Sequence, residues 1–260
     1  MKKFILPMII LAALIITSCE NNPKPEDQNT GDKQMTVNES EPSEFSAQGK
    51  IIKIDENGIH VQDGDKVDVY NVDPERTRGL FIGEYVGINK LDGDKYDVVR
   101  EENHDYNTLI TSEGKSVKRI SGTVGEVKNA YITATTEAGE IKLSKTGDFD
   151  LKTGDQFMAD YVELSGSNEV ISYYDEASKI TVTAKEISRD NNGMMRIFAV
   201  SDSNVEYDII VRADTVTNFK HSSLEPNDKI NIYPYNVSGD VPAAVDAKLI
   251  MLNHDDDSRY

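Results

Sequence analysis

The sequence predicts an all-β protein of small five-stranded units in tandem, behind an N-terminal export signal and a disordered tether. Val, Ile, Thr and Tyr recur in short alternating runs, and turns of Asp, Asn and Gly separate these runs at regular spacing. No long stretch has the 3.6-residue periodicity of an amphipathic helix. Most of the 260-residue chain is therefore assigned to strands and hairpins.

The N-terminus has the order of a bacterial export signal. Two lysines follow Met1, and residues 4–16 form an apolar run that is too short to span a bilayer comfortably. Pro7 interrupts this run, and small residues then precede Cys19. We therefore predict a signal peptide over residues 1–18.

The tetrapeptide Ile16-Thr17-Ser18-Cys19 resembles the lipobox of bacterial lipoproteins, in which an aliphatic residue and two small residues precede a cysteine. The resemblance implies that Cys19 receives a diacylglycerol and that the chain is then cleaved between Ser18 and Cys19. Two acyl chains hold a protein on a membrane stably, whereas one chain holds it only marginally. We expect a protein anchored through Cys19 to the extracytoplasmic face of the cell membrane. The alternative is an uncleaved N-terminal anchor helix.

Composition restricts the chemistry and the partners of the mature protein. Cys19 is the single cysteine, so a monomer has no disulfide and the mature domain has no thiol chemistry of its own. The formal net charge is −18, and removal of the two N-terminal lysines makes it more negative. Such a chain repels nucleic acid and anionic lipid headgroups, so no nucleic-acid partner is predicted.

Residues 19–45 are predicted to be a disordered acidic tether. They are mostly Pro, Asn, Glu, Asp, Ser and Thr, with almost no large apolar side chain. Such a segment cannot bury enough surface to offset its ordering entropy. A flexible chain of this length reaches about 25–30 Å, which lifts the folded part off the membrane.

Strand-like runs and turns then alternate to the end of the chain. The run Lys50–Ile54 is typical of a strand, and the turn Asp55–Gly58 ends in Asn-Gly, which supplies the positive φ of a hairpin. A similar order of strands recurs twice. We predict β units over residues 46–103, 117–176 and 179–253, with accessible polar linkers near 104–116 and 175–179.

A short pattern before the fourth strand of each unit supports the repeat. It consists of a leucine, two variable residues, a turn residue and an acid, and its copies are about 70 residues apart, a period that suits small domains. The copies are Leu80-Phe81-Ile82-Gly83-Glu84, Leu151-Lys152-Thr153-Gly154-Asp155 and Leu224-Glu225-Pro226-Asn227-Asp228. We expect the turn residue to allow a sharp entry into the strand and the acid to cap backbone N–H groups.

The layout resembles tandem OB-fold-like modules found in lipoproteins of low-GC Gram-positive bacteria, over roughly residues 47–252. The resemblance implies small five-stranded barrels. An SH3-like barrel or a small sandwich would give nearly the same pattern, so these architectures stay open.

No metal site or cofactor is predicted. The histidines His60, His104, His221 and His254 share no ligand-like spacing and pair with no cysteine. The turns Asp63-Gly64-Asp65 and Asp92-Gly93-Asp94 could hold calcium, but a twelve-residue loop ending in glutamate is absent. Ordinary hairpin turns are the better interpretation.

No catalytic residue is predicted either, and the protein is not expected to be an enzyme. No serine lies in a Gly-x-Ser-x-Gly elbow, and Gly122–Gly125 lacks the following helix of a phosphate-binding loop. Tyrosines on a barrel face can stack on sugars or bases, but they are more often packing residues. Those on or beside predicted strands are Tyr85, Tyr96, Tyr161, Tyr173, Tyr174, Tyr207, Tyr233 and Tyr235.

The leading functional hypothesis is a lipid-anchored cell-envelope protein that acts as a non-catalytic binding or interaction module, with an envelope protein or a glycan as its partner. The alternative is a surface protein that binds a specific ligand, a glycan or a divalent cation, through its tyrosine-bearing or acid-rich faces. A two-lobed solute-binding protein is disfavoured because long helical periodicity is missing.

Overall fold

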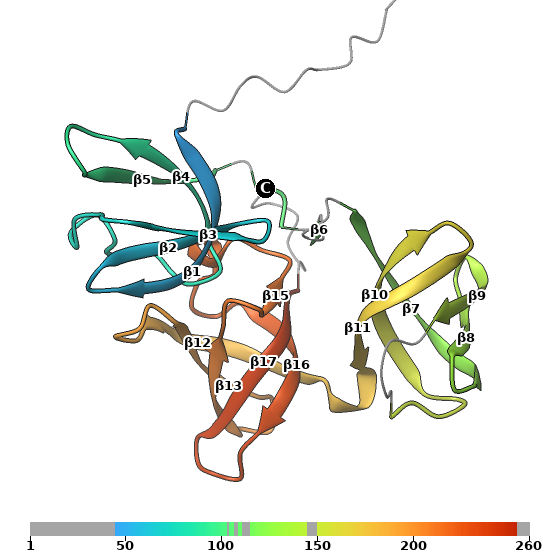
Figure 1. Ribbon diagram of the computed structural model, residues 1–260. Helices are drawn as coiled ribbons and strands as arrows, with labels where there is room; N and C mark the ends of the chain where they lie inside the picture. Colours follow the sequence, from blue (N-terminus) through green and yellow to red (C-terminus); the bar gives the residue numbers. More distant parts are fainter. Residues whose placement is uncertain (1–44, 103, 107–108, 111–114, 145–149, 254–260) are drawn as a thin grey trace, which may run out of the picture. The chain divides into compact units, whose positions relative to one another are not determined.

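The computed structural model describes residues 45–102, 104–106, 109–110, 115–144 and 150–253 (Figure 1). These residues form strands, and their helical segments are two 3-10 turns, η1 (Glu176–Ser178) and η2 (His221–Ser223). Neither turn is a candidate for crossing a membrane. The predicted signal peptide, Cys19 and the tether up to residue 44 lie outside the described residues. The prediction of an all-β fold is confirmed.

Module 1 is a five-stranded sheet with the order β3-β2-β1-β4-β5. Its strands are β1 (Ala47–Asp55), β2 (Gly58–Asp63), β3 (Lys66–Tyr70), β4 (Tyr85–Lys90) and β5 (Tyr96–Arg100). The predicted hairpin turn joins β1 to β2, and Gly58 there has a φ of +121°. A parallel bridge between Val72 and Tyr96 brings the chain after β3 next to β5.

Module 2 closes into a ring because β10 pairs with both β11 and β7 (Figure 1). Its strands are β7 (Ser116–Val127), β8 (Tyr131–Thr136), β9 (Gly139–Ser144), β10 (Gln156–Leu164) and β11 (Ser167–Asp175), and the short β6 (Leu109–Ile110) pairs with β7. The segment Gly122–Gly125 lies inside β7, as expected for a strand and not for a phosphate-binding loop.

Module 3 closes in the same way, through parallel pairing of β14 with β17. Its strands are β12 (Ile180–Arg189), β13 (Met195–Val200), β14 (Glu206–Val211), β16 (Lys229–Val237) and β17 (Ala243–Leu252), and the short β15 (Val216–Thr217) runs parallel to β17.

The three modules share one connectivity. In modules 2 and 3 the ring runs through the first, second, third, fifth and fourth strands and back to the first, and the third and fifth strands are parallel. Module 1 has the same neighbours, with the Val72–Tyr96 bridge between its third and fifth strands. This arrangement fits the five-stranded, partly open Greek-key barrel of an OB fold. The strand order therefore favours the OB-like interpretation over the SH3-like barrel and the sandwich.

The predicted repeat pattern forms a turn of the same conformation in all three modules. In each copy the turn residue has a positive φ, which is +94° at Gly83, +94° at Gly154 and +79° at Asn227. The backbone N–H of each turn residue donates a hydrogen bond to a carbonyl of the module's first strand. These bonds are Gly83 to Ile51 at 2.7 Å, Gly154 to Val124 at 2.8 Å and Asn227 to Ala184 at 2.8 Å. The turn thus ties the entry of the fourth strand to the first strand.

The acid caps the same turn in each module. Its carboxylate accepts a hydrogen bond from the backbone N–H of the residue after the leucine. The pairs are Phe81 to Glu84 at 3.0 Å, Lys152 to Asp155 at 2.7 Å and Glu225 to Asp228 at 2.8 Å. The leucines Leu80, Leu151 and Leu224 are buried in the three module cores. Both roles expected of this pattern are confirmed.

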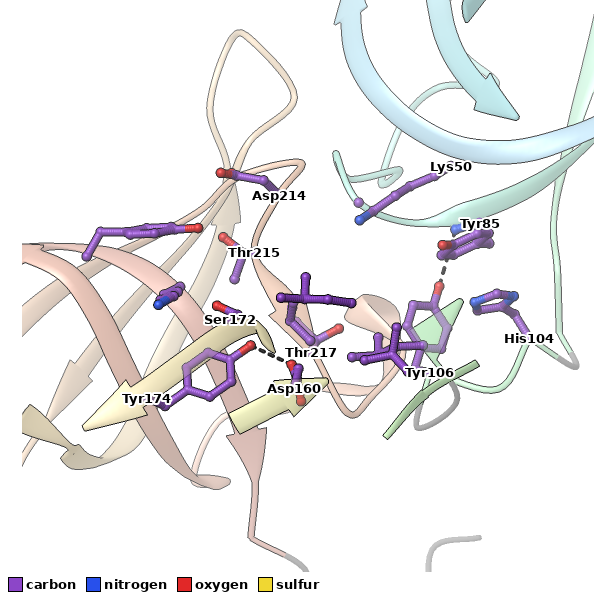
Figure 2. Close-up of a pocket in the computed structure, with 17 residues that line it drawn as sticks. Lys50, Tyr85, His104, Tyr106, Asp160, Ser172, Tyr174, Asp214, Thr215 and Thr217 are labelled. Atoms are coloured by element: carbon purple, nitrogen blue, oxygen red, sulfur yellow. Dashed lines mark hydrogen bonds between the residues drawn. The ribbon is translucent and has the colours of Figure 1, made fainter. Parts of the chain in front are cut away.

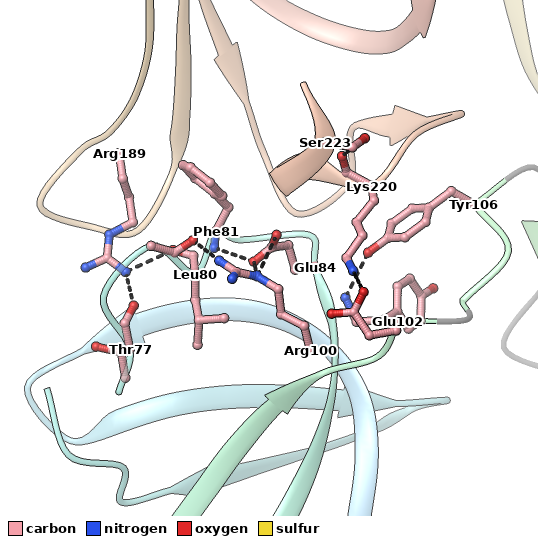
Figure 3. Close-up of polar contacts among 12 residues, drawn as sticks. Thr77, Leu80, Phe81, Glu84, Arg100, Glu102, Tyr106, Arg189, Lys220 and Ser223 are labelled. Carbon is pink, nitrogen blue, oxygen red and sulfur yellow. Dashed lines mark hydrogen bonds and ion pairs between the residues drawn. The ribbon is translucent and has the colours of Figure 1, made fainter. Parts of the chain in front are cut away.

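Modules 1 and 3 contact each other directly, although module 2 separates them in the sequence. Figure 3 shows Arg189 of β12 reaching the loop before β4, where its guanidinium donates hydrogen bonds to the carbonyls of Thr77 at 2.5 Å and Leu80 at 2.9 Å. The N–H of Ile82 donates to the carbonyl of Gly193 at 2.9 Å. These bonds use backbone groups that the strand ladders leave free.

Modules 2 and 3 share a small apolar cluster. Met158 and Tyr174 of module 2 are buried together with Tyr233 and Leu249 of module 3. The Tyr233 hydroxyl donates a hydrogen bond to the Glu176 carboxylate in η1. The predicted linker near residues 175–179 is thus held at one point by module 3, instead of being free along its whole length. The boundaries 46–103, 117–176 and 179–253 remain predictions as limits of separately folding domains.

Candidate functional site

Residues of all three modules line one cleft with a volume of about 510 Å³ (Figure 2). Module 1 and the segment after it contribute Lys50, Gly83, Tyr85, His104 and Tyr106. Module 2, with β6, contributes Leu109, Val117, Asp160, Ile171, Ser172 and Tyr174, and module 3 contributes Asp214, Thr215, Val216, Thr217, Tyr235 and Lys248. This volume lies within the range of about 300–1,000 Å³ that is typical of small-molecule sites.

Three aromatic rings form the side of the cleft that belongs to module 1. Tyr85 at the start of β4 stacks on His104 with ring centroids 3.5 Å apart, and Tyr106 meets both rings edge-on. The backbone N–H of Tyr85 donates to the Tyr106 hydroxyl at 3.2 Å. Burial raises the pKa of Tyr106 to about 12, so its phenol stays protonated and can donate a hydrogen bond. The expected accessible linker near residues 104–116 is therefore packed where it begins.

Lys50 on β1 carries a positive charge into this side of the cleft. Its ammonium makes no hydrogen bond or ion pair with a described residue, and burial lowers its pKa. The charge of Asp214 in module 3 acts in the opposite direction. A desolvated ammonium without a hydrogen-bond acceptor is unfavourable, and an incoming anion would relieve this cost.

Asp160 on β10 is a buried carboxylate whose hydrogen bonds are made within the protein. Arg119 of β7 binds it through two bonds of 2.7 and 2.8 Å, and the Tyr174 hydroxyl donates to it at 2.7 Å. Figure 2 shows the Tyr174 hydroxyl directed at Asp160. Burial and the Asp160 charge raise the pKa of Tyr174, so the phenol remains a donor. The guanidinium of Arg119 neutralises the charge of Asp160 within the cleft.

Lys248 of β17 lies among tyrosines. Its ammonium donates to the Tyr173 carbonyl at 2.5 Å and is 4.8, 5.1 and 5.7 Å from the ring centres of Tyr173, Tyr174 and Tyr235. Cation–π contacts of this length stabilise the charge, and burial lowers the Lys248 pKa. Tyr235 is 56% exposed, so part of its surface remains open for contact.

The cleft does not use the face by which OB folds commonly bind oligonucleotides, which centres on the second and third strands. None of its lining residues comes from β2, β3, β8, β9, β13 or β14. They come from first, fourth and fifth strands and from the segments around β6 and β15. The site therefore depends on how the modules pack together.

Among the described histidines, His104 and His221 both lie near the Tyr106 ring, with ring centroids 4.8 and 6.4 Å from it, and His60 lies elsewhere. His60 contacts Asp55 at 3.1 Å, His104 lines the cleft, and His254 lies outside the described residues. His221 is buried against Gly83, and burial together with the nearby Lys50 lowers its pKa to about 4. No group of three or more His, Cys, Asp or Glu in the described part of the chain is placed to hold a metal ion.

The acidic turns are ordinary structural elements, and so is the basic cluster formed by Lys115, Lys118 and Arg119. The turns 63–65 and 92–94 join β2 to β3 and β4 to β5, with positive φ at Gly64 and Gly93. In the basic cluster, Lys118 pairs with Glu163 at 2.7 Å and Arg119 with Asp160. Its charges are therefore largely neutralised.

Sequence reasoning identified part of the cleft. It named Tyr85, Tyr174 and Tyr235 among the strand tyrosines, without grouping them. It missed Tyr106, because a tyrosine in a polar segment after the last strand of a unit gives no periodic signal. Lys50 and Lys248 lie next to apolar residues on their strands, as solvent-facing lysines also do, so no local pattern distinguishes them.

Comparison with known proteins finds no matching family model and no matching curated protein. Among solved structures, a multidomain protein with nucleic acid binding domains from Streptococcus pneumoniae matches at 14% identity with a TM-score of 0.20, covering 78% of this chain and 72% of its own. Drosophila Unr CSD456 matches at 10% identity with a TM-score of 0.22, covering 79% and 96%. Superpositions this loose carry no argument about function, and the OB-like interpretation depends on the strand order alone.

Proposed function

We propose that this chain is a lipid-anchored, non-catalytic binding protein of the cell envelope, and that the cleft lined by its three modules is the binding site. The observation that supports this proposal is the combination of the desolvated Lys50 ammonium with open aromatic and apolar surface. Ile171 and Tyr235, which are 53% and 56% exposed, both line the cleft. Apolar lining with a few converging polar groups is typical of a ligand site.

Binding is favoured over catalysis because several polar groups of the cleft are already engaged. Asp160 is held by Arg119 and Tyr174, and the hydroxyls of Thr215 and Thr217 donate to backbone carbonyls. A general base or nucleophile needs a side chain that is free to exchange protons with a substrate.

The anchor is proposed from the order of basic residues, apolar run and lipobox that ends at Cys19. Cys19→Ala removes the thiol that would carry the diacylglycerol. We expect this variant to be unlipidated and lost from the membrane fraction, which immunoblots of fractionated cells and mass spectrometry of the N-terminus measure. A variant that stays with the membrane and keeps its intact N-terminus would instead indicate an uncleaved anchor helix.

The proposed partner is an envelope protein or a glycan and not nucleic acid. The net charge of −18 opposes a polyanion, and the cleft lies off the strand faces that OB folds commonly use for oligonucleotides. We expect the full chain in detergent to show no binding of single-stranded DNA or RNA at physiological salt by fluorescence anisotropy. Micromolar binding that weakens as salt rises would contradict this part of the proposal.

The cleft itself is tested by binding of the purified full chain to isolated cell envelopes. Replacing both Ile171 and Tyr235 with Ala removes its exposed apolar surface, and we expect at least tenfold weaker retention. The control is Val67→Ala with Val69→Ala, which removes exposed surface of β3 outside the cleft (45% and 50% exposed). Equal retention of both double variants and the wild type would refute the cleft as the binding site.

A further inference from the structure

We propose that the cleft binds an acidic sugar, which is a pyranose ring carrying one carboxylate, either free or as a unit of an envelope polysaccharide. This inference rests on the proposed binding function and names its ligand class. Two features support it, a surplus positive charge beside Lys50 and aromatic surface that modules 1 and 3 contribute to the cleft.

The charged groups of the cleft leave room for one anion. Lys50 and Lys248 line the cleft and are cationic, Asp160 and Asp214 line it and are anionic, and Arg119, which is not a lining residue, neutralises Asp160. One positive charge therefore remains in a chain whose formal net charge is −18. A ligand with a single carboxylate matches this local surplus, whereas a polyphosphate would meet the repulsion of the surrounding acidic protein.

Lys50 is the cation that still needs an acceptor. Lys248 already donates to the Tyr173 carbonyl, and Arg119 is bidentate on Asp160. The Lys50 ammonium makes no hydrogen bond to a described residue, and its electrostatic neighbour is Asp214 across the cleft. A carboxylate placed against Lys50 would form a charge-assisted hydrogen bond in a partly desolvated site, where such bonds are strongest.

The aromatic surface provides for the rest of the sugar. The C–H-bearing face of a pyranose is apolar and packs on aromatic rings, while its hydroxyls need hydrogen-bond partners. Tyr235 offers an exposed ring on module 3, and the stacked Tyr85 and His104 with Tyr106 line the part of the cleft that belongs to module 1. The protonated phenol of Tyr106 and the hydroxyl of Ser172 are polar groups at the same cleft.

The test measures binding of defined sugars to the purified full chain in detergent by isothermal titration calorimetry. The probes are galacturonic and glucuronic acid, trisaccharides in which one of these acids is joined to two neutral sugars, the methyl ester of each of these sugars, and uridine monophosphate. We expect at least one acidic sugar to bind, and its uncharged ester to bind at least tenfold more weakly. Binding of a trisaccharide without its monosaccharide would assign the site to a polymer, and binding of both would assign it to a single ring.

Two substitutions on β1 and one on β16 test whether the sugar binds in the cleft. Lys50→Met removes the ammonium and keeps most of the side-chain volume, so we expect at least tenfold weaker binding. Lys53→Met is the matched control, because Lys53 also lies on β1 but is 58% exposed and pairs with Asp55 at 2.7 Å outside the cleft. Tyr235→Leu provides an independent measurement, since this exposed ring can be removed without disturbing a module core. If Lys50→Met fails to fold by circular dichroism, Tyr235→Leu decides.

Several outcomes would overturn the inference. These are the absence of binding by every acidic sugar, equal binding of acid and ester, tighter binding of uridine monophosphate, or wild-type affinity in Tyr235→Leu or in folded Lys50→Met. The inference and the proposed function fail separately. If envelope binding depends on Ile171 and Tyr235 while no acidic sugar binds or competes, the cleft is a binding site for another ligand. If envelope binding is indifferent to both residues, the binding function itself is wrong.

Discussion

Replacing Asp160 with Asn should destabilise the protein much more than the same change in an exposed Asp–Arg pair. Asp160 is 2% exposed and accepts three hydrogen bonds, two from Arg119 and one from Tyr174, all between 2.7 and 2.8 Å. The amide keeps the shape but loses the charge, and its NH2 group faces another donor. Hydrogen bonds to charged groups contribute about 1.5–3 kcal/mol each.

A simple sum of these bonds would overstate the loss. The Arg119 side chain is 25% exposed, so water partly replaces its lost partner, and the substitution also removes the cost of desolvating a carboxylate. We therefore expect the free energy of unfolding to fall by about 3 kcal/mol, the lower end of the range for a broken buried pair. For a chain of this size the melting temperature should fall by about 6–12 °C.

The matched control is Asp246→Asn. Arg212 binds Asp246 through the same two guanidinium nitrogens, both at 2.8 Å, but the two side chains are 50% and 28% exposed. Exposed pairs contribute less than about 1 kcal/mol. Urea unfolding at pH 7, followed by far-ultraviolet circular dichroism because the chain has no tryptophan, measures both variants. Equal losses, or a loss below about 1 kcal/mol for Asp160→Asn, would refute the assigned role of burial.

Two further predictions concern His221 and the turn glycines. The pKa of His221 is about 4 in the folded state and about 6.5 in an unfolded chain. Protons therefore bind preferentially to the unfolded state, and the free energy of unfolding decreases as the pH falls from 6.5 to 4. Between pH 7 and 5 the wild type should lose about 2 kcal/mol relative to His221→Asn, and equal pH profiles in urea titrations would show that His221 is not responsible. Gly154→Ala should cost about 1–2 kcal/mol from backbone strain alone, because a Cβ there meets nothing within 4 Å. Gly83→Ala should cost more, because its Cβ would lie 2.6 Å from His221, and equal melting temperatures for the two variants would contradict this contact.

The three turns could be predicted from sequence because all their interactions are local or lead to the neighbouring strand. A leucine, a residue that accepts positive φ and an acid three positions after the capped N–H are sufficient, and each copy repeats the same bonds. The copies differ in the turn residue, which is glycine in modules 1 and 2 and Asn227 in module 3, and in the acid. Glu84 in module 1 is longer than Asp155 and Asp228, lies buried and also pairs with Arg100.

The cleft could not be predicted, because its residues come together only when separate modules pack. Lys50 and Tyr235 lie 185 positions apart, on the first strand of module 1 and the fourth strand of module 3. No periodicity within either strand relates them. The contact of Arg189 with the carbonyls of Thr77 and Leu80 could not be predicted either, since any donor side chain that reaches a backbone carbonyl can make such a hydrogen bond.

The direct contact between modules 1 and 3 makes module 2 an insertion whose two ends are held by one supporting body. Closing a chain over an insert depends only weakly on insert length, at about 0.6 kcal/mol per doubling, so the contact tolerates inserts of different size. The apolar side chains Tyr233 and Leu249 of module 3 must, however, remain covered, as module 2 covers them here. Any β module that covers these residues could occupy the place of module 2 and would bring its own replacements for Asp160, Ile171 and Tyr174. Such an exchange would change the residues that module 2 contributes to the cleft, while Lys50 and Tyr235 would remain on the supporting body.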